Sequence, residues 1–295
     1  MRFPQATTKD NRIVSAPLPH HNTVLDGEMV VERDPSTGKH VRRFYAYDIM
    51  ALNGTKLIRE AFKMRYNLIE ERVVLPRKHE GFLIASDAQY KHRGYDYGVE
   101  CFKVRRKGFY PLHCSETILT TLIPKRLCHE SDGLIFQGWE DPYVPLTHHD
   151  LLKWKYAHLN SVDFRMDWEE GKGGEGGEGG EGGVGGRAHL SVQYGGQLKR
   201  LEGCRFALGA KAASDGVTMA SLSGRIVECS WDPHTETWVF MRERRDKRLP
   251  NAGSVYAKVV RSISDNIDQD RLVAHIAQAT KEAIYAKDNR IKVPM

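Results

Sequence analysis

LLKWKYAHLNSVDF, residues 151–164, contains two short strand-like runs. How the charged side chains of these runs are interpreted decides the fold assigned to the whole chain. In the first run, side chains alternate between the two faces of a strand, so Lys153 and Lys155 project from one face about 7 Å apart. Two cations at this spacing repel one another. Either they face solvent, as lysines on an edge strand commonly do, or they hold an anion between them. Residues outside this stretch have to separate the two interpretations.

The composition is that of an ordinary globular protein with a modest basic excess. At 295 residues the chain is long enough for two domains with buried cores, and 40% of its residues are hydrophobic. Its 44 lysines and arginines exceed its 38 acidic residues, which gives a net charge of +6. The basic residues concentrate in KVRRK (103–107) and RERRDKR (242–248). This charge suits a nucleotide or nucleic-acid ligand without identifying one.

The cysteines and the apolar runs exclude several classes of protein. The five cysteines show neither CxxC spacing nor an even framework, so we expect free thiols in a reducing compartment and no zinc site. No apolar run approaches the length of about 18 residues that a membrane span needs, and the first residues do not read as a secretion signal. The sequence therefore predicts no membrane partner.

Strand-like and helix-like segments alternate along the chain, which predicts a mixed α+β fold. Strand composition occurs at 23–33, 42–52, 132–138, 151–155, 160–168, 188–195, 224–231 and 237–244. Helical spacing of apolar residues occurs at 54–74, 115–127, 254–263 and in the C-terminal tail.

A Gly-Gly-Glu repeat at 169–187 interrupts the strand-rich part of the chain. It cannot bury apolar surface, and a tandem repeat of glutamates lacks the defined turn of a phosphate-binding loop. Because both flanks alternate like strands, we interpret the repeat as an overgrown hairpin loop inside one domain. The short strands and one helix within about 100 residues predict a small β-barrel of the oligonucleotide-binding (OB) type.

Five motifs carry charged or aromatic side chains on strands. They are LDGEMVV (25–31), FYAYDIMALNG (44–54), ESDGLIFQGWEDPYVP (130–145), LLKWKYAHLNSVDF (151–164) and WVFMRERRDKRLPN (238–251). In the first motif, Asp26 and Glu28 share one face of a strand, although acidic residues around a glycine are also typical of a turn. In the second, Tyr45 and Tyr47 share a face, and the third repeats the acid-then-glycine arrangement around Asp132.

In this order and spacing the motifs resemble the covalent nucleotidyltransferase superfamily of polynucleotide ligases and mRNA-capping guanylyltransferases. DGLIF, EDPYVP, LLKWKY, NSVDF, IVECSWDP and WVFMRxRxDKxxPN resemble the guanylyltransferase region of eukaryotic, plant-type mRNA-capping enzymes. The resemblance covers nearly the whole chain apart from the Gly-Glu insert. It implies an incomplete, ligase-like nucleotidyltransferase domain over 1–160, then an OB-fold domain over 161–264 with a flexible loop at 169–187, and a C-terminal helix over 265–295.

The resemblance also implies a function, that of an mRNA guanylyltransferase acting in 5′ mRNA capping in the nucleus. In this family a lysine attacks the α-phosphate of GTP to form lysyl-GMP, and the GMP then passes to the 5′-diphosphate end of RNA. A divalent metal, Mg²⁺ or Mn²⁺, is the implied cofactor. The implied partners are GTP and nascent mRNA, with the tail of RNA polymerase II left open as a further one.

Roles for single residues follow from the same resemblance. Lys153 and Lys155 hold the α-phosphate, and Asp163 is a further acidic residue of the catalytic site. Glu28 corresponds to the acidic residue near the ribose, and Tyr47 to the ring that stacks on guanine. The remaining candidates are Asp132, a metal-side carboxylate, and Arg244, Asp246 and Lys247 of the RxDK motif, which binds the β- and γ-phosphates of GTP.

The chain departs from the family pattern at the nucleophile. The family's lysine lies in a KxDG motif upstream of DGEMVV, whereas the residues two positions before the three Asp-Gly pairs here are Val24, Glu130 and Ala213. Residues 1–5, MRFPQ, already resemble the segment that follows KxDG in the family. We therefore expect the nucleophilic lysine to be absent from this chain and the chain to be inactive in covalent GMP transfer.

Two interpretations stay open. The first is a guanylyltransferase whose sequence is incomplete, and the second is a non-catalytic remnant that binds nucleotide, RNA ends or other capping components. Ligase-type joining of nucleic-acid ends is disfavoured by EDPYVP and by WVFMRERRDK. An open reading frame that encodes KxDG upstream of the Met1 codon would favour the first interpretation.

Overall fold

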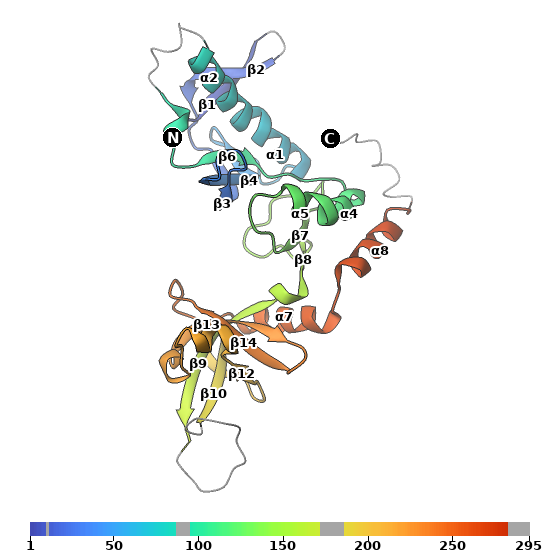
Figure 1. The fold of residues 1–295 in the computed structure, drawn as a ribbon. Coiled ribbons are helices and arrows are strands. Elements are labelled where there is room, and N and C mark those ends of the chain that lie inside the picture. Colours follow the sequence, from blue (N-terminus) through green and yellow to red (C-terminus); the bar gives the residue numbers. More distant parts are fainter. Residues whose placement is uncertain (10–11, 87–94, 172–185, 283–295) are drawn as a thin grey trace. The chain divides into compact units, whose positions relative to one another are not determined.

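The computed structural model describes residues 1–9, 12–86, 95–171 and 186–282, and it divides into two compact units (Figure 1). The first unit comprises Met1–Trp154 with His275–Met295, and the second comprises Lys155–Ala274. Most of the Gly-Glu repeat and the end of the expected C-terminal helix lie outside the described residues. Among the helices that the structure describes, none has the length and apolar character needed to cross a membrane.

The first unit is built around a four-stranded sheet in the order β3-β4-β5, with β6 pairing in parallel with β4. Its strands are β3 Val24–Arg33, β4 His40–Leu52, β5 Thr55–Lys56 and β6 Lys103–Arg106. A separate antiparallel pair consists of β1 Pro4–Lys9 and β2 Arg12–Pro19. The long strands β3 and β4 confirm the prediction made from their β-branched and aromatic composition.

A β-bulge interrupts the pairing of β3 with β4. Asp26 of β3 pairs with Asp48, but the next residue, Gly27, pairs with Ala46, which leaves Tyr47 as the extra residue on β4. A bulge changes the direction of the side chain it carries and is common beside active sites. Glycine is required at position 27, because a Cβ atom there would lie 2.5 Å from a backbone carbonyl oxygen of β4.

A long helical segment packs its apolar residues against this sheet. It consists of α1 Phe62–Leu68, a π-helical turn Ile69–Val74 and α2 Leu75–Ser86. Ile69 and Val73 of the segment and Ile49 of β4 are fully buried and form the core of the unit. The predicted helix over 54–74 thus begins later and continues further than its sequence pattern indicated.

Shorter elements complete the first unit. The second predicted helix is made of α4 Ser115–Thr117, a π-helical turn Ile118–Leu122 and α5 Ile123–Arg126. β7 Gly133–Phe136 and β8 Leu152–Lys155 form a two-stranded sheet. In β8, Lys153 and Lys155 are exposed and Trp154 is buried, while Leu152, which shares the face of Trp154, is exposed as well.

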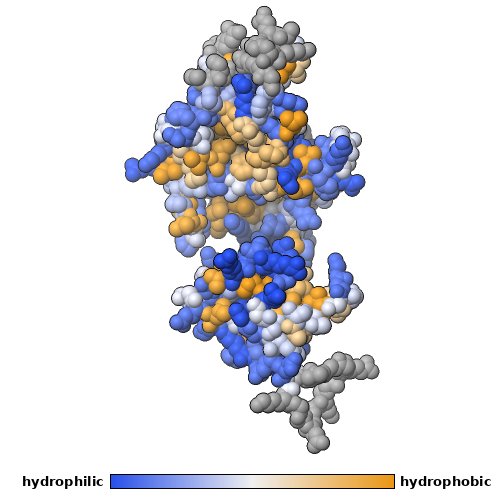
Figure 2. All heavy atoms as spheres, turned by 90° about the vertical axis from the view of Figure 1, so that its left-hand side faces the viewer, coloured by the Kyte–Doolittle hydropathy of each residue, from blue (hydrophilic) through white to orange (hydrophobic). Residues whose placement is uncertain are grey.

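The surface of the first unit includes apolar side chains on β3. Met29 and Val31 are exposed at alternate positions of this strand, which has β4 as its neighbour in the sheet. Figure 2 shows hydrophobic residues at several places on the surface of this unit. The apolar residues of the unit are thus not confined to its core.

The second unit contains a six-stranded sheet in the order β11-β10-β9-β13-β14-β12. Its strands are β9 Ser161–Glu170, β10 Gly186–Tyr194, β11 Gln197–Arg200, β12 Phe206–Ala207, β13 Arg225–Asp232 and β14 Thr237–Glu243. Glu170 pairs with Gly186, so the strands beside the Gly-Glu repeat form the predicted hairpin. The helices are α6 Gly209–Ser214, α7 Gly253–Asp265 and the beginning of α8 Gln269–Ala279, whose last residues are assigned to the first unit.

The mixed α+β class is confirmed, whereas the sheet of the second unit is open instead of closed into the predicted barrel. One edge strand, β11, has four residues and the other, β12, has two, and no ladder joins them within the described ranges. Strands this short cannot supply the staggered ladder that closure requires. Tyr256 of α7 instead packs against Phe164 and Trp238 in the core.

Candidate functional site

Asp163 is the centre of a charged cluster in the second unit. It lies on β9, is only 4% exposed, and its backbone exchanges hydrogen bonds of 2.8 Å with the side chain and backbone N–H of Asn251. Its carboxylate accepts hydrogen bonds from Arg244 Nη1, at 3.0 and 3.1 Å, and from Lys247 Nζ. Three of the predicted site residues therefore meet at one buried carboxylate.

Arg244 lies between two carboxylates. Its Nε and Nη2 donate to the two oxygens of Asp246 at 3.0 and 2.8 Å, while its Nη1 donates to Asp163. The hydrogen bond with Asp246 raises the pKa of Arg244 above its ordinary value and lowers the pKa of Asp246 to about 2. Arg244 therefore remains a cation of fixed orientation throughout the working pH range, although solvent screens its contact with the exposed Asp246.

Glu228 extends this cluster along β13. It pairs with Asp163 across the two strands and accepts hydrogen bonds of 2.7 Å from Ser161 Oγ and Arg242 Nε. Burial raises the pKa of Glu228, but these hydrogen bonds outweigh burial, so the pKa lies below its ordinary value. The sequence did not predict a role for Glu228 or Ser161, because only the pairing of β9 with β13 places them beside Asp163.

In the first unit, Glu28 faces a cation of the basic run KVRRK, to which the sequence assigned no contact with Glu28. Lys107, the last residue of KVRRK, donates a hydrogen bond from Nζ to the Glu28 carboxylate. The same Nζ lies 5.6 Å from the centroid of the Tyr45 ring. The partners Glu28 and Lys107 are 79 residues apart in sequence, so no local pattern indicates their contact.

Tyr47, the residue at the β-bulge, lies among carboxylates. Burial, and then the charge of Asp26 and a hydrogen bond to it, raise the pKa of Tyr47 to about 12. Tyr143 of the EDPYVP motif also donates a hydrogen bond to Asp26, at 2.8 Å. Asp26 therefore links the bulge to EDPYVP (140–145), called the acidic loop below. The sequence did not predict this role.

A buried arginine fixes the backbone around this bulge. Arg65 of α1 is 1% exposed, and its Nε and Nη2 donate to the two carboxylate oxygens of Asp48 at 2.8 Å each. Its Nη1 donates to the carbonyl oxygens of Glu60 and, at 2.9 Å, Asp141. Arg65 thus joins α1, β4 and the acidic loop through one side chain.

A second buried ionic network lies further along β3 and β4. Glu32 is 5% exposed and accepts hydrogen bonds from Arg43 Nε, from the Tyr45 hydroxyl and, at 3.2 Å, from His129 Nδ1. Burial raises the pKa of Glu32, but these hydrogen bonds outweigh burial and hold the pKa below its ordinary value of 4.5. The network holds the Tyr45 hydroxyl in place and, through His129, ties the segment before β7 to the sheet.

This network predicts a dependence of stability on pH. A carboxylate whose pKa is lower in the folded than in the unfolded state adds stability above the unfolded pKa, and that stability is lost as the pH falls. We expect Glu32→Gln to be less stable than the parent chain near neutral pH and the difference to narrow between about pH 5 and pH 3. Urea unfolding at several pH values measures this, with Glu202→Gln, at an exposed position, as the control. A difference that stays constant with pH would contradict the assignment.

The remaining candidates lie on or beside the sheet of β7 and β8. Asp132 is exposed and immediately precedes β7, and Lys153 and Lys155 occupy exposed positions of β8. The cation that donates a hydrogen bond to Glu28 is Lys107 of the KVRRK run. The structure therefore brings together four candidates of the second unit, while the other candidates are divided between two sheets. The first group consists of Asp163, Arg244, Asp246 and Lys247.

Comparison with known proteins gives matches over nearly the whole chain. A family model described as mRNA capping enzyme, catalytic domain, matches residues 1–157, and one described as mRNA capping enzyme, C-terminal domain, matches residues 159–273. The mRNA-capping enzyme of Mus musculus is 33% identical over 276 residues, which cover 93% of this chain and 40% of that protein. The mRNA-capping enzyme subunit alpha of Schizosaccharomyces pombe is 29% identical over 266 residues, which cover 90% of this chain and 62% of that protein.

Among solved structures, the crystal structure of the ligase domain from M. tuberculosis LigD matches with a TM-score of 0.28 and 17% identity, over 77% of this chain and 74% of that one. A TM-score this low supports no argument about the site. The chain spans about 40% of the length of the mouse relative. Because the two family models together match residues 1–157 and 159–273, the chain belongs to the mRNA-capping enzyme family.

Proposed function

We propose that this chain is the guanylyltransferase part of an mRNA-capping enzyme, which binds GTP and takes part in transferring GMP to the 5′-diphosphate end of RNA. The observation that carries the proposal is the convergence of Arg244 and Lys247 on Asp163 in a chain of this family. Guanylyl transfer moves negative charge onto phosphoryl oxygens, and cations held in fixed positions stabilise that charge.

In this proposal each of the two domains, 1–160 and 161–264, carries residues with a role toward the nucleotide, and the helical segment 265–295 follows them. In the first domain, Tyr47 stacks on guanine, Glu28 lies near the ribose, and the exposed lysines of β8 hold the α-phosphate. The RxDK motif of the second domain binds the β- and γ-phosphates. The residues with these phosphate-binding roles are Lys153, Lys155, Arg244, Asp246 and Lys247.

The contacts of the RxDK cations suit such a role. The guanidinium group of Arg244 carries five N–H donors on three nitrogens. Asp163 and Asp246 accept hydrogen bonds from all three nitrogens, so the orientation of the guanidinium group is already fixed. Lys247 is 36% exposed and gives one contact to Asp163, so its ammonium can present further donors to phosphate oxygens. Asp163 is then a positioning residue for both cations as well as part of the site.

A divalent metal, Mg²⁺ or Mn²⁺, fits the residues present when it is shared with the nucleotide. Within the four described ranges, no three His, Cys, Asp or Glu side chains form a group that could hold a metal ion by themselves. Mg²⁺ sites often combine one or two carboxylates with phosphate oxygens and water, and the exposed Asp132 offers such a carboxylate. When bound, the metal would supply positive charge at the phosphoryl oxygens.

A nuclear location and the tail of RNA polymerase II as a further partner belong to the same proposal. Their support is membership in a family that is named for mRNA capping.

The proposal predicts that the lysines of β8 contribute to GTP affinity. A hydrogen bond to a charged group is worth about 1.5 to 3 kcal/mol, so Lys153→Ala and Lys155→Ala should each weaken GTP binding by about 10-fold or more. Titration calorimetry with GTP and Mg²⁺ measures this. Lys258→Ala removes an exposed lysine of α7 and should leave the affinity unchanged. ATP binding as tight as GTP binding, or full GTP affinity in Lys153→Ala, would contradict the proposal.

A second candidate function is that of a non-catalytic module that binds nucleotide or RNA ends. One observation favours it, namely that no lysine stands two positions before any of the three Asp-Gly pairs of the chain. The two functions differ in whether GMP becomes covalently attached to the protein.

A further inference from the structure

A cationic pocket of about 330 Å³ lies beside the Asp163 cluster. Arg165 lies two positions after Asp163 on β9, so both side chains leave the same face of the sheet. The same relation holds on β13, where Ile226 pairs with Arg165 and Glu228 pairs with Asp163. Six basic side chains and one carboxylate line the pocket. The pocket thus adjoins the cluster along the strands and shares Arg244 and Lys247 with it.

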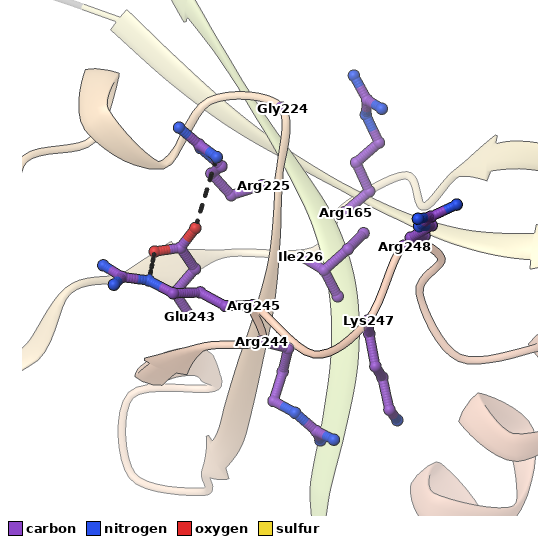
Figure 3. Close-up of a pocket in the computed structure, with 9 residues that line it drawn as sticks. All are labelled: Arg165, Gly224, Arg225, Ile226, Glu243, Arg244, Arg245, Lys247 and Arg248. Atoms are coloured by element: carbon purple, nitrogen blue, oxygen red, sulfur yellow. Dashed lines mark hydrogen bonds and ion pairs between the residues drawn. The ribbon is translucent and has the colours of Figure 1, made fainter.

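The basic side chains of the pocket divide into two sets. Figure 3 shows Arg244 and Lys247 extending to one side of their loop and Arg165 extending to the opposite side. Arg244 and Lys247 are the two cations that donate hydrogen bonds to Asp163. The second set consists of Arg165, Arg225, Arg245 and Arg248. The sequence analysis gave none of these four a role.

The second set carries more positive charge than its neighbouring carboxylates neutralise. Arg225 and Arg245 share one carboxylate, that of Glu243, at 3.7 and 2.9 Å, and their side chains are 62% and 86% exposed. Arg165 contacts Asp167 at 3.2 Å, and Arg248 adds a further exposed guanidinium group. Several exposed guanidinium groups around one cavity are suited to binding phosphates, because each can donate two parallel hydrogen bonds.

A second cavity, of about 460 Å³, continues from the first. The two share Arg225, Glu243 and Arg245, and the second is also lined by the apolar side chains of Leu222 and Phe240. A cationic cavity joined to one with an aromatic ring and aliphatic groups matches a ligand in which phosphates alternate with planar bases. An acidic peptide would use the guanidinium groups but not this apolar lining.

We propose that the pocket binds the sugar-phosphate backbone of single-stranded RNA independently of its sequence. The strand would pass over the second set of arginines next to the site where the RNA end reacts. Contacts to phosphates fix the position of a strand but do not read its bases, so the affinity should depend on salt and little on sequence. The choice of RNA rests on the proposed function, whereas the excess charge of the pocket does not.

The test is fluorescence anisotropy of the full chain with a labelled single-stranded RNA that carries a 5′-hydroxyl, titrated at several salt concentrations between about 50 and 200 mM. The double variant Arg165→Ala, Arg248→Ala should weaken binding about 10-fold or more and lower the slope of log K against log salt by about two. Arg225→Ala, at an exposed position, provides a second variant should the double variant fold poorly.

Two further variants sharpen the test. Arg261→Ala removes one positive charge, as Arg225→Ala does, but from an exposed position of α7, and it should leave binding unchanged. Glu243→Gln removes the carboxylate that Arg225 and Arg245 share, so it should tighten binding about 3-fold. An opposite response to the loss of a cation and the loss of an anion is expected only of a site for an anion.

An unchanged salt slope in the pocket variants, or an equal loss in Arg261→Ala, would overturn the proposal. A phosphorylated acidic peptide that binds more tightly than the RNA and depends on the same arginines would also overturn it, because it would assign the pocket to a protein partner. The RNA probe has no 5′-diphosphate and the assay contains no GTP. RNA binding without GTP binding would therefore refute only the proposed function, and GTP binding without RNA binding would refute only the pocket.

Discussion

Arg65→Met is expected to lower the free energy of unfolding of the first unit by about 3–5 kcal/mol, because it leaves the buried Asp48 carboxylate without its cation. Asp48 is buried and receives two hydrogen bonds of 2.8 Å from this guanidinium. The substitution also removes the donor to the carbonyl oxygens of Glu60 and Asp141, which ties the acidic loop to α1. Equilibrium unfolding of the full chain in urea measures the loss.

Two comparisons distinguish an uncompensated charge from a general loss of packing. The double variant Asp48→Leu, Arg65→Met removes both charges and should recover part of the stability. Lys63→Met breaks the exposed pair of Lys63 with Glu140 and should cost less than about 1 kcal/mol. A loss below about 1 kcal/mol in Arg65→Met, or a double variant that is less stable than Arg65→Met, would contradict this account.

The fold was largely predictable from the sequence because its strands are long and alternate regularly. The alternation in LLKWK predicted that Lys153 and Lys155 share one face of a strand, and both occupy exposed positions of β8. The hairpin around the Gly-Glu repeat followed from the strand patterns on both sides of it. The closed barrel was predicted wrongly, because closure depends on edge strands whose length the sequence did not reveal. β12 has only two residues and pairs in parallel with β14.

The candidate site was predictable only where residue type and motif coincide. Asp163, Arg244 and Lys247 belong to motifs that resemble the family, and they meet in the structure. Arg65 could not be predicted, because an arginine within a run of amphipathic helical spacing usually faces solvent. Lys107 belongs to a basic run of a kind that is usually surface, and its partner is distant in sequence.

The register of β3 and β4 was likewise hidden from the sequence. The bulge that singles out Tyr47 exists only in the pairing of two strands, and neither strand shows it alone. Tertiary pairing therefore determines which charged and aromatic residues share a site.

When the chain is incubated with radiolabelled GTP and Mg²⁺, no covalent GMP is expected to remain attached after denaturation. A phosphoramidate bond requires a neutral amine at the α-phosphate, and an ordinary lysine, with a pKa of about 10.4, is neutral in only about one molecule in 2,500 near pH 7. Lys153 and Lys155 are proposed to act as charges. Lys107 donates its ammonium hydrogen bond to the Glu28 carboxylate.

The bond formed in the family's reaction is labile to acid and stable to alkali, so the two treatments distinguish a genuine adduct from trapped nucleotide. Should such an adduct form, substitutions of lysine by arginine would identify the nucleophile, because arginine keeps the positive charge but has no amine that can be deprotonated. Loss of the label in Lys107→Arg, with retention in Lys153→Arg and Lys155→Arg, would assign the attack to the lysine beside Glu28. Any such adduct would refute the expectation of an inactive chain. This particular result would also show that the nucleophile lies outside any KxDG motif.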